Sequence, residues 1–517
     1  MVEMEKPDFL FILNNSLSYP EPPFNPDKPY PEARFAFPDL DPGNKVYEAV
    51  RNLLEKSGLD RENQGSPAWN PFRGLVKDGE TIVIKPNLVM HEPPDAGGKH
   101  CMTTHGSIIR PLLDFIYLLQ CQENIKVNVI IADVPIQGAS FAAIMEETGI
   151  RALADYYTCH FDLSLACLDL RRQIARIDSS GFLTTTEAPG DPAGYEHVTL
   201  PESFLDDISS KSKWLCPGYG DVNPVAKQAW RNQTMKHYYV IPRSILKARL
   251  FINLPKIKTH KKAGVTLAMK NLIGIVGDKS WLPHFQRGSR KQGGDEFDDD
   301  QFLLKILTSN AERLLQSRSR LLWKITRFIN RKFIKRIFRK DLRKRATSDT
   351  AALPSKAGRH NFFLNGDWYG NDTIWRPILD LNRLLWTTDN RGVLTGKQQR
   401  SYICIGEGII AGERNGPLEP AARRTGLLTL GCNPVIHDIC CSRLMGFDWR
   451  KIPQLREAKR LKDTFSFNGD TGKLKITGTA LGNHGTSGLV SVPFDEMPRL
   501  DMQPSDGWKD HIELEKE

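Results

Sequence analysis

The fold of this 517-residue chain is decided by the stretch Arg249–Gly277, which reads RLFINLPKIKTHKKAGVTLAMKNLIGIVG. Its apolar run Leu250–Leu254 is long enough to form a strand that is buried on both faces. The run stops at Pro255, and an apolar pattern with helical spacing follows. Potential cations crowd the end of this strand, and they repel one another unless an anion lies between them. These residues are Lys256, Lys258 and His260. The stretch therefore predicts a ligand site for an anion.

Outward from this stretch, apolar segments of strand length alternate with amphipathic segments of helix length. Their short spacing predicts a mostly parallel sheet with flanking helices, which is an α/β fold. Thr104 is the predicted N-cap of the second helix, and Asn433 with Pro434 predicts the start of the last one. Smaller or antiparallel strands are expected between residues 165 and 247. The predicted strands are 8–13, 81–85, 126–133, 250–254, 401–405 and 427–430, and the predicted helices are about 45–57, 107–120, 141–157 and 434–446.

Length and composition suit a soluble globular protein of two to four domains. We expect one main α/β domain in two parts, residues 1–290 and 361–462, separated by a polar loop and a basic helical insertion at 291–360. A C-terminal extension follows at 463–517. No apolar run approaches the roughly 20 residues of a membrane span, and residues 1–15 lack the features of a signal peptide. We therefore expect a cytoplasmic protein, with a peripheral position on the inner membrane face as an open alternative.

Residues 311–345 form a basic element. They hold 14 Lys or Arg against two acidic residues, and so account for the whole net charge of +10. Apolar side chains recur there at helical spacing, which predicts a long amphipathic helix. Its surface suits an anionic membrane, while packing on its own domain remains the alternative. No recognised nucleic-acid module accompanies the helix, so we expect no nucleic-acid partner.

Charged and amide side chains follow several of the predicted strands. In open α/β sheets, ligands bind beyond the carboxyl ends of the strands, so these side chains converge if the strands are parallel neighbours. The predicted helix after His260 would place Thr266 and Lys270 on one face. The residues at the four strand ends are Lys85 and Asn87, then Asp133, then Lys256, Lys258 and His260, and finally Glu407 and Glu413 with Asn415 nearby.

We expect His260, Lys258 and Asp133 to be catalytic, because an imidazole with a pKa near neutrality suits general acid–base catalysis. Carboxylates with one or two imidazoles suit a divalent metal ion, and the expected ligands are Glu407 and Asp438, with Glu413 and His437 nearby in the sequence. The expected substrate-binding residues are Lys85, Asn87, Lys256, Lys270, Asn271 and Asn415.

Other motifs exclude several classes of site. The nine cysteines form no CxxC pair, so no intrinsic iron–sulfur cluster is expected. There is neither a GxGxxG after a strand nor a GxxxxGK[ST] loop, which disfavours dinucleotide and P-loop binding. Residues 293–297 spell GGDEF, the signature of diguanylate cyclases, but they are not flanked by apolar strands. We interpret that match as coincidence.

Several segments resemble domain-of-unknown-function family 362, a family of uncharacterised prokaryotic proteins. The resemblance implies an α/β protein without an agreed activity. Some relatives carry a ferredoxin-like iron–sulfur module, whose cysteine runs are absent here, and residues 366–383 resemble a longer subgroup associated with polysaccharide gene neighbourhoods. Glu407 stands where the family would have Asp, and His437 where it would have an aliphatic residue. The matching segments are VIKPNLV at 83–89, TTH at 103–105, INLPKIKTH…GVTLAMKNLIG at 252–274, EGIIAGERNGP at 407–417 and NPVIHDICCSRLMGFDWRKIP at 433–453.

The leading hypothesis is an enzyme that acts on an anionic small molecule, phosphorylated or carboxylated and sugar-derived, in a crevice lined by Lys, His and Asp. The main alternative is a non-catalytic, membrane-peripheral component of an assembly that works through residues 311–345. A redox or radical protein that borrows a cofactor from a partner is a third class. Nothing in the sequence names the reaction.

Overall fold

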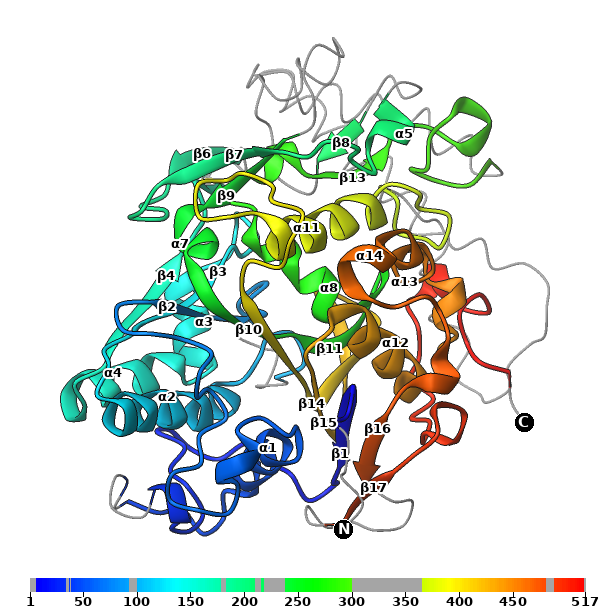
Figure 1. The fold of residues 1–517 in the computed structure, drawn as a ribbon. Helices are drawn as coiled ribbons and strands as arrows, with labels where there is room; N and C mark the ends of the chain where they lie inside the picture. Colours follow the sequence, from blue (N-terminus) through cyan, green and yellow to red (C-terminus); the bar gives the residue numbers. More distant parts are fainter. Residues whose placement is uncertain are drawn as a thin grey trace, which may run out of the picture.

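The computed structural model describes residues 6–33, 37, 39–92, 100–177, 183–209, 215–217, 238–299, 365–479 and 488–515. Its main feature is an 11-stranded mixed sheet (Figure 1) with the path β17-β16-β1-β15-β14-β10-β2-β3-β4, while β11 pairs with β14 and with β12. Every neighbouring pair from β14 to β4 is parallel. With helices on both faces, this architecture confirms the predicted α/β class.

The strands of the sheet come from both ends of the chain. The C-terminal strand β16 pairs in parallel with β1, and β1 pairs antiparallel with β15. The strands are β1 (Phe9–Leu13), β2 (Thr81–Pro86), β3 (Asn128–Asp133), β4 (Ser164–Asp169), β10 (Ala248–Leu254), β11 (Lys256–His260), β12 (Gly264–Thr266), β14 (Ser401–Asn415), β15 (Glu419–Gly431), β16 (Ile476–Thr479) and β17 (Leu489–Ser491).

Three two-stranded antiparallel sheets lie outside the main sheet, as expected for residues 165–247. They pair β5 (Gln173–Ile177) with β6 (Leu183–Glu187), β7 (Tyr195–Thr199) with β9 (Tyr238–Pro242), and β8 (Leu215–Pro217) with β13 (Pro283–Gln286).

Strand β10 is buried on both faces, as its apolar run predicts. Leu250, Ile252 and Leu254 join one hydrophobic core, and Phe251 joins the other. The first core packs against α1 (Lys45–Lys56), α2 (Ile109–Glu123), α3 (Phe141–Glu147) and α4 (Ile150–His160). The second packs against α5 (Asp206–Ser209), α7 (Arg243–Leu246), α8 (Ala268–Asn271), α11 (Trp375–Thr387), α12 (Pro434–Met445), α13 (Pro453–Arg456) and α14 (Lys462–Phe465).

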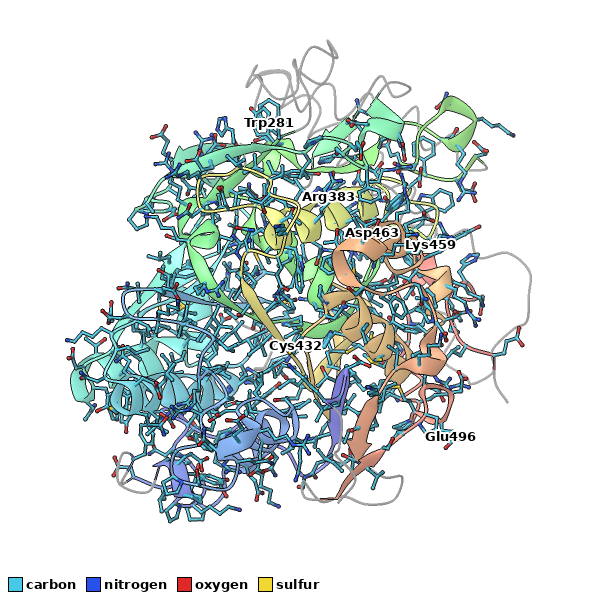
Figure 2. The ribbon with its side chains drawn as sticks, viewed as in Figure 1. Trp281, Arg383, Cys432, Lys459, Asp463 and Glu496 are labelled. Atoms are coloured by element: carbon cyan, nitrogen blue, oxygen red, sulfur yellow. The ribbon has the colours of Figure 1, made fainter. Side chains whose placement is uncertain are left out.

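Side chains fill both layers, and the C-terminal elements turn charged residues outward. Lys459, Asp463 and Glu496, which are labelled in Figure 2, are all exposed. Cys432 lies nearer the middle of the view, just after β15. The eight cysteines other than Cys216 are free thiols.

Several predicted boundaries are wrong. Strand β14 continues through Asn415, so Glu407 lies inside a strand rather than beyond its end. The predicted helix 141–157 is two helices, because Gly149 takes a left-handed conformation (φ 70°). After His260 the chain forms β12 before the short helix α8, so Thr266 is a strand residue. Thr104 is not an N-cap: its hydroxyl donates to the Leu254 carbonyl and accepts from the Asn87 amide.

The start of α12 is predicted correctly. The Asn433 side chain accepts hydrogen bonds from the Val435 and Ile436 amides, Pro434 occupies the first turn, and Gly446 ends the helix with φ 90°. The basic segment 311–345 lies outside the described residues, and so does the rest of the predicted insertion 291–360 from residue 300 onward. Within the described ranges, no helix is long and apolar enough to cross a membrane.

Candidate functional site

A cavity of about 330 Å³ lies where β2, β3 and β11 end, beside α8. Its wall carries five lysines and two histidines against three carboxylates. Pro417 and Leu418, in the turn between β14 and β15, and Glu419, the first residue of β15, form part of its rim. The basic and acidic residues that line it are Lys258, Lys261, Lys262, Lys270, Lys279, His260, His284, Asp133, Asp367 and Glu419.

The structure brings six of the predicted site residues together on this wall: Asn87, Asp133, Lys258, His260, Lys270 and Asn271. Lys85 lies directly behind it, in contact with Asp133 and Asn271. Four predicted residues make their contacts away from the lining: Lys256, Glu407, Asn415 and Asp438.

Lys85 and Asp133 form a buried ion pair that holds the ends of β2 and β3 together. Lys85 Nζ donates to Asp133 Oδ1 (2.8 Å), and Asp133 also accepts from the Val134 and Leu88 amides (2.8 and 2.6 Å). Gly274 closes over the pair, since a Cβ there would lie 2.1 Å from Asp133 Oδ1. All of these groups are already paired and hold the ends of β2 and β3 in place, and the catalytic role of Asp133 stays a prediction.

Three asparagines form a chain of hydrogen bonds that ends at the cavity. Asn253 Nδ2 donates to the Ala268 carbonyl, which fixes the orientation of its amide, and its Oδ1 accepts from Asn271 Nδ2 (2.7 Å). Asn271 Oδ1 in turn accepts from Asn87 Nδ2 (2.9 Å). The chain therefore leaves Asn87 Oδ1 as a buried acceptor without a hydrogen-bond partner in the described part of the protein.

The hairpin of β11 and β12 supplies donors to the opposite part of the wall. Lys258 pairs across the hairpin with Thr266, so their side chains are neighbours on one face. Gly264, in the turn, has φ 76° and packs against the Trp508 ring, which a Cβ would approach to 3.1 Å. The Thr266 hydroxyl is buried and has no hydrogen-bond partner among the described residues.

His260 is a neutral hydrogen-bond donor. Its Nδ1 accepts from the Lys262 and Ala263 amides (3.0 and 3.2 Å), so the ring proton is on Nε2. Burial, together with Lys270, Lys262 and Lys258, holds the pKa of His260 well below its usual value. The near-neutral pKa on which its predicted acid–base role rested is therefore wrong for this environment.

The lysines of the wall differ in how their charges are compensated. Lys262 pairs with Asp367 (2.8 Å) and Lys261 with Glu419 (3.8 Å). Lys258 and Lys270 have no carboxylate within 4 Å among the described residues. Burial and the neighbouring amines hold the pKa of Lys258 well below its usual value. Burial and nearby lysines lower the pKa of Lys270 to about 7.

The sequence interpretation missed Lys262, Lys279, His284 and Asp367. Lys279 Nζ donates to the Val134 carbonyl (2.7 Å), and His284 Nδ1–H donates to the Leu282 carbonyl (2.9 Å). Burial and Lys262 lower the pKa of His284 to about 3, so its ring is neutral. The position of Lys262, two residues after His260, could have indicated its place on the wall. No local pattern links residues 279, 284 and 367 to the hairpin.

Lys256 belongs to a second buried cluster. Its Nζ donates to Glu407 Oε2 (2.6 Å) and to the Tyr19 hydroxyl (3.0 Å), and Tyr19 donates to Glu407 Oε1 (2.6 Å). The pairing of β11 with β14 shifts register between Lys256 and Lys258, so the two lysines make different contacts. Lys256 therefore compensates the Glu407 charge.

Asp438 positions α8. Its two oxygens accept from the Ala268 and Met269 amides (both 2.8 Å), and Oδ1 also contacts His437 Nδ1 (2.9 Å). Glu407 is likewise occupied by Lys256 and Tyr19. Among the described residues, no group of three or more His, Cys, Asp or Glu side chains could hold a metal ion. The geometry therefore gives no support to the expected metal ligands Glu407 and Asp438, and Asn415 instead bonds Asp506 (2.9 Å).

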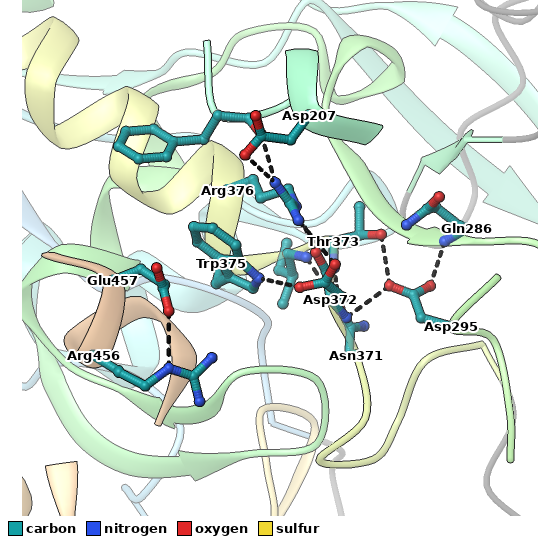
Figure 3. A network of polar contacts seen from close by, with 12 residues as sticks. Asp207, Gln286, Asp295, Asn371, Asp372, Thr373, Trp375, Arg376, Arg456 and Glu457 are labelled. Atoms are coloured by element: carbon teal, nitrogen blue, oxygen red, sulfur yellow. Dashed lines mark hydrogen bonds and ion pairs between the residues drawn. The ribbon is translucent and has the colours of Figure 1, made fainter. Parts of the chain in front are cut away.

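A larger, open groove lies apart from this wall, and Figure 3 shows its polar contacts. Asp295, the aspartate of the GGDEF match, accepts from the Gln286 and Asp372 amides and from the Thr373 hydroxyl. Arg376 pairs with Asp207 and Asp372. Asp295 therefore stabilises local structure next to α11, in agreement with the interpretation of the pentapeptide as coincidence.

Comparison with known proteins adds a family but no activity. The family model described as "Domain of unknown function (DUF362)" matches residues 215–443, which include β11, β12 and α8. A crystal structure of a Thermotoga maritima protein, a structural-genomics target, aligns with a TM-score of 0.21 and 9% identity over 51% of this chain and 47% of that one. No curated protein matches the chain.

The family match contains the hairpin and α8, and hence Lys258, His260, Thr266, Lys270 and Asn271, while Asn87 and Asp133 lie before it. Residues 215–443, somewhat less than half of this chain, are therefore similar to DUF362, a family that has no assigned function.

Proposed function

We propose that the cavity binds a small hydroxylated anion, such as a phosphorylated or carboxylated sugar derivative, and that the protein is an enzyme acting on it. The main support is an excess of unused hydrogen-bond donors around one space. Lys258 and Lys270 lack carboxylate partners, and His260 presents Nε2–H. Buried amines without counterions are unfavourable, and a bound anion would relieve that cost.

The shape and polarity of the wall suggest the rest of the ligand. A volume of about 330 Å³ is near the lower limit of small-molecule sites, which suits a compact metabolite. Asn87 Oδ1 needs a donor, which a hydroxyl group would supply. We assign the anion to Lys258, with His260 and Lys270 as further donors to the ligand on the same wall, and the hydroxyl to Asn87.

Binding of matched ligands to the full-length protein tests this proposal. We would titrate inorganic phosphate, a hexose phosphate, a hexuronic acid and the neutral hexose, following binding by calorimetry and native mass spectrometry. The anionic sugars should bind more tightly than the neutral one. Because charge-assisted hydrogen bonds contribute about 1.5–3 kcal/mol, Lys258→Met should weaken anion binding by roughly 10- to 100-fold.

Lys459→Met is the matched control, because it removes the same charge from an exposed position. It should leave binding unchanged. Equal affinity for neutral and anionic sugars, or unaltered binding by folded Lys258→Met, would show that the cavity is not the anion site.

A further inference from the structure

Lys270 differs from every other lysine on the cavity wall. Within the described part of the chain, its Nζ has no hydrogen-bond or ion-pair partner. Each of the other amines has at least one partner: Lys258 donates to the Met102 carbonyl, and Lys279 to the Val134 carbonyl. Lys261 and Lys262 pair with carboxylates. Lys270 is thus the amine that the fold leaves available to react.

The fold also holds Lys270 in place from behind. It lies on α8, whose first amides donate to Asp438, and the next residue, Asn271, is fixed by Lys85 and Asn253. Asn382 Nδ2 donates to the Met269 carbonyl (3.0 Å), which ties the same short helix to α11. The backbone of Lys270 is therefore positioned by contacts that leave its side-chain nitrogen free.

The charges around Lys270 favour an unprotonated amine. Burial and the neighbouring lysines lower its pKa to about 7, so the neutral amine is far more populated at neutral pH than in an exposed lysine. Desolvation beside other cations is a known way to make lysine nucleophilic. The titratable groups that face it are Lys85, Lys258, Lys262, Lys279, His260 and His284, with Asp133 and Asp367 on the same wall.

We propose that Lys270 is the nucleophile of the cavity and forms an imine with a carbonyl group of an anionic substrate. This inference rests on the proposed function, and it narrows the substrate class to aldehydes or ketones that carry a carboxylate or a phosphate. Lys258 holds the anionic group, and His260 donates its Nε2–H to the carbonyl oxygen.

The step balances without a further reactant. The Nζ lone pair attacks the carbonyl carbon, and the π electrons of C=O move to oxygen, giving a carbinolamine after proton transfer from nitrogen to oxygen. Loss of the second nitrogen-bound proton, together with the hydroxyl group, releases one water and leaves C=N. No atom is oxidised or reduced. The neutral His260 ring polarises the oxygen without giving up its proton.

Reductive trapping tests the inference. We would incubate the full-length protein with glyoxylate, pyruvate or dihydroxyacetone phosphate and sodium cyanoborohydride, and locate adducts by peptide mass spectrometry. The reduced adduct should lie on Lys270, and prior saturation with inorganic phosphate should suppress it. Lys270→Arg keeps the positive charge and should remove the adduct, whereas the exposed-site control Lys459→Arg should retain it.

Binding of the same three compounds, measured without reductant, separates the two proposals. Saturable binding that is weakened by Lys258→Met but gives no Lys270 adduct would overturn the imine and leave the proposed function standing. Absence of saturable binding by these three compounds, and by the hexose phosphate and hexuronic acid as well, would overturn the proposed function too.

A second measurement needs no variant. Trace labelling with acetic anhydride between pH 5 and 10, read for each lysine by mass spectrometry, should show Lys270 reaching half of its maximal reactivity near pH 7. If Lys270 followed the same pH dependence as exposed Lys459, it would not be the nucleophile inferred here.

Discussion

Thr266 carries a hydroxyl that the fold buries without giving it a partner in the described part of the chain. A buried, unsatisfied polar group costs about 1–3 kcal/mol, and valine has nearly the same shape without that group. Thr266→Val should therefore leave the free energy of unfolding of the unliganded protein unchanged or raise it by about 1 kcal/mol. It should also weaken anion binding, because the hydroxyl lies beside Lys258. Urea unfolding and calorimetry measure the two effects.

Thr259 is the matched control on the same hairpin. Its buried hydroxyl donates to the Arg414 carbonyl (2.7 Å), and it does not line the cavity. Thr259→Val should cost about 1 kcal/mol of stability and leave affinity intact. A Thr266→Val protein that loses stability as much as Thr259→Val would show that the Thr266 hydroxyl is satisfied within the unliganded protein.

At the residue scale, the sequence identified the types of side chain but not their partners. The spacing of Lys258 and His260 after an apolar run predicted a place beyond a strand end, and both residues line the cavity. The role of Lys256 was not predictable, because its partners Tyr19 and Glu407 are distant in sequence. The tautomer of His260 was not predictable either, since it depends on how the chain turns back after β11.

At the scale of elements, the sequence predicted the ends of those strands whose position depends only on parallel packing. β2 and β3 were found from apolar runs, and their ends meet at the cavity as parallel neighbours do. The prediction failed at β14, because the predicted strand 401–405 ended before the segment that holds Gly406, Gly408 and Gly412. The strand continues through these glycines because other side chains and backbone lie close to them. At Gly412, for example, a Cβ would lie 2.8 Å from Lys258 Cβ.

The segment η4 (Leu272–Ile275) lies against the Lys85–Asp133 ion pair, and a substitution in this segment tests that contact. Gly274→Ala would place a methyl group 2.1 Å from Asp133 Oδ1 and 2.7 Å from Lys85 Nζ. Either the ion pair or the segment that follows α8 must move. We expect a loss of roughly 3 kcal/mol in the free energy of unfolding, together with weaker anion binding, because Asn271 contacts Lys85.

Gly138 provides the comparison, because a Cβ at that position has no atom within 4 Å. Gly138→Ala should change neither stability nor affinity appreciably. If Gly274→Ala likewise changed neither the stability measured by urea unfolding nor the affinity measured by calorimetry, the close contact would not be what positions this wall of the cavity.

At the scale of the whole molecule, one sheet unites segments that the predicted division kept apart. β1 lies between β15 and β16, so the first strand is held by the second part of the main domain and by the C-terminal extension. Such long-range pairing leaves no local sequence signal, which is why the extension was predicted only as a separate piece. The cavity likewise needs β2, β3, β11 and the segment around Asp367 to be assembled together.

The cluster of lysines should also give the whole molecule a characteristic pH dependence of stability. Lys85, Lys258, Lys262 and Lys270 all have a lowered pKa in the folded state, so the unfolded chain binds more protons. Stability must then rise with pH, by up to about 1.36 kcal/mol per unit for each such group. Between pH 7 and 8.5, we expect the free energy of unfolding of the unliganded protein to rise by about 1–3 kcal/mol.

The lysines dominate the lower part of this window. The buried carboxyls of Asp295 and Asp380, with pKa values raised to about 6, are mostly ionised above pH 7, and cysteines of the unfolded chain, whose ordinary pKa is about 8.5, ionise appreciably only toward its upper end. Lys270→Met should flatten the slope measured by urea unfolding, while exposed Lys459→Met should not. Saturating anion should flatten it as well, because a bound anion raises the pKa of nearby amines. A wild-type stability that stays constant or falls from pH 7 to 8.5 would mean that these amines are already compensated, which would remove the electrostatic reason for an anion to bind in the cavity.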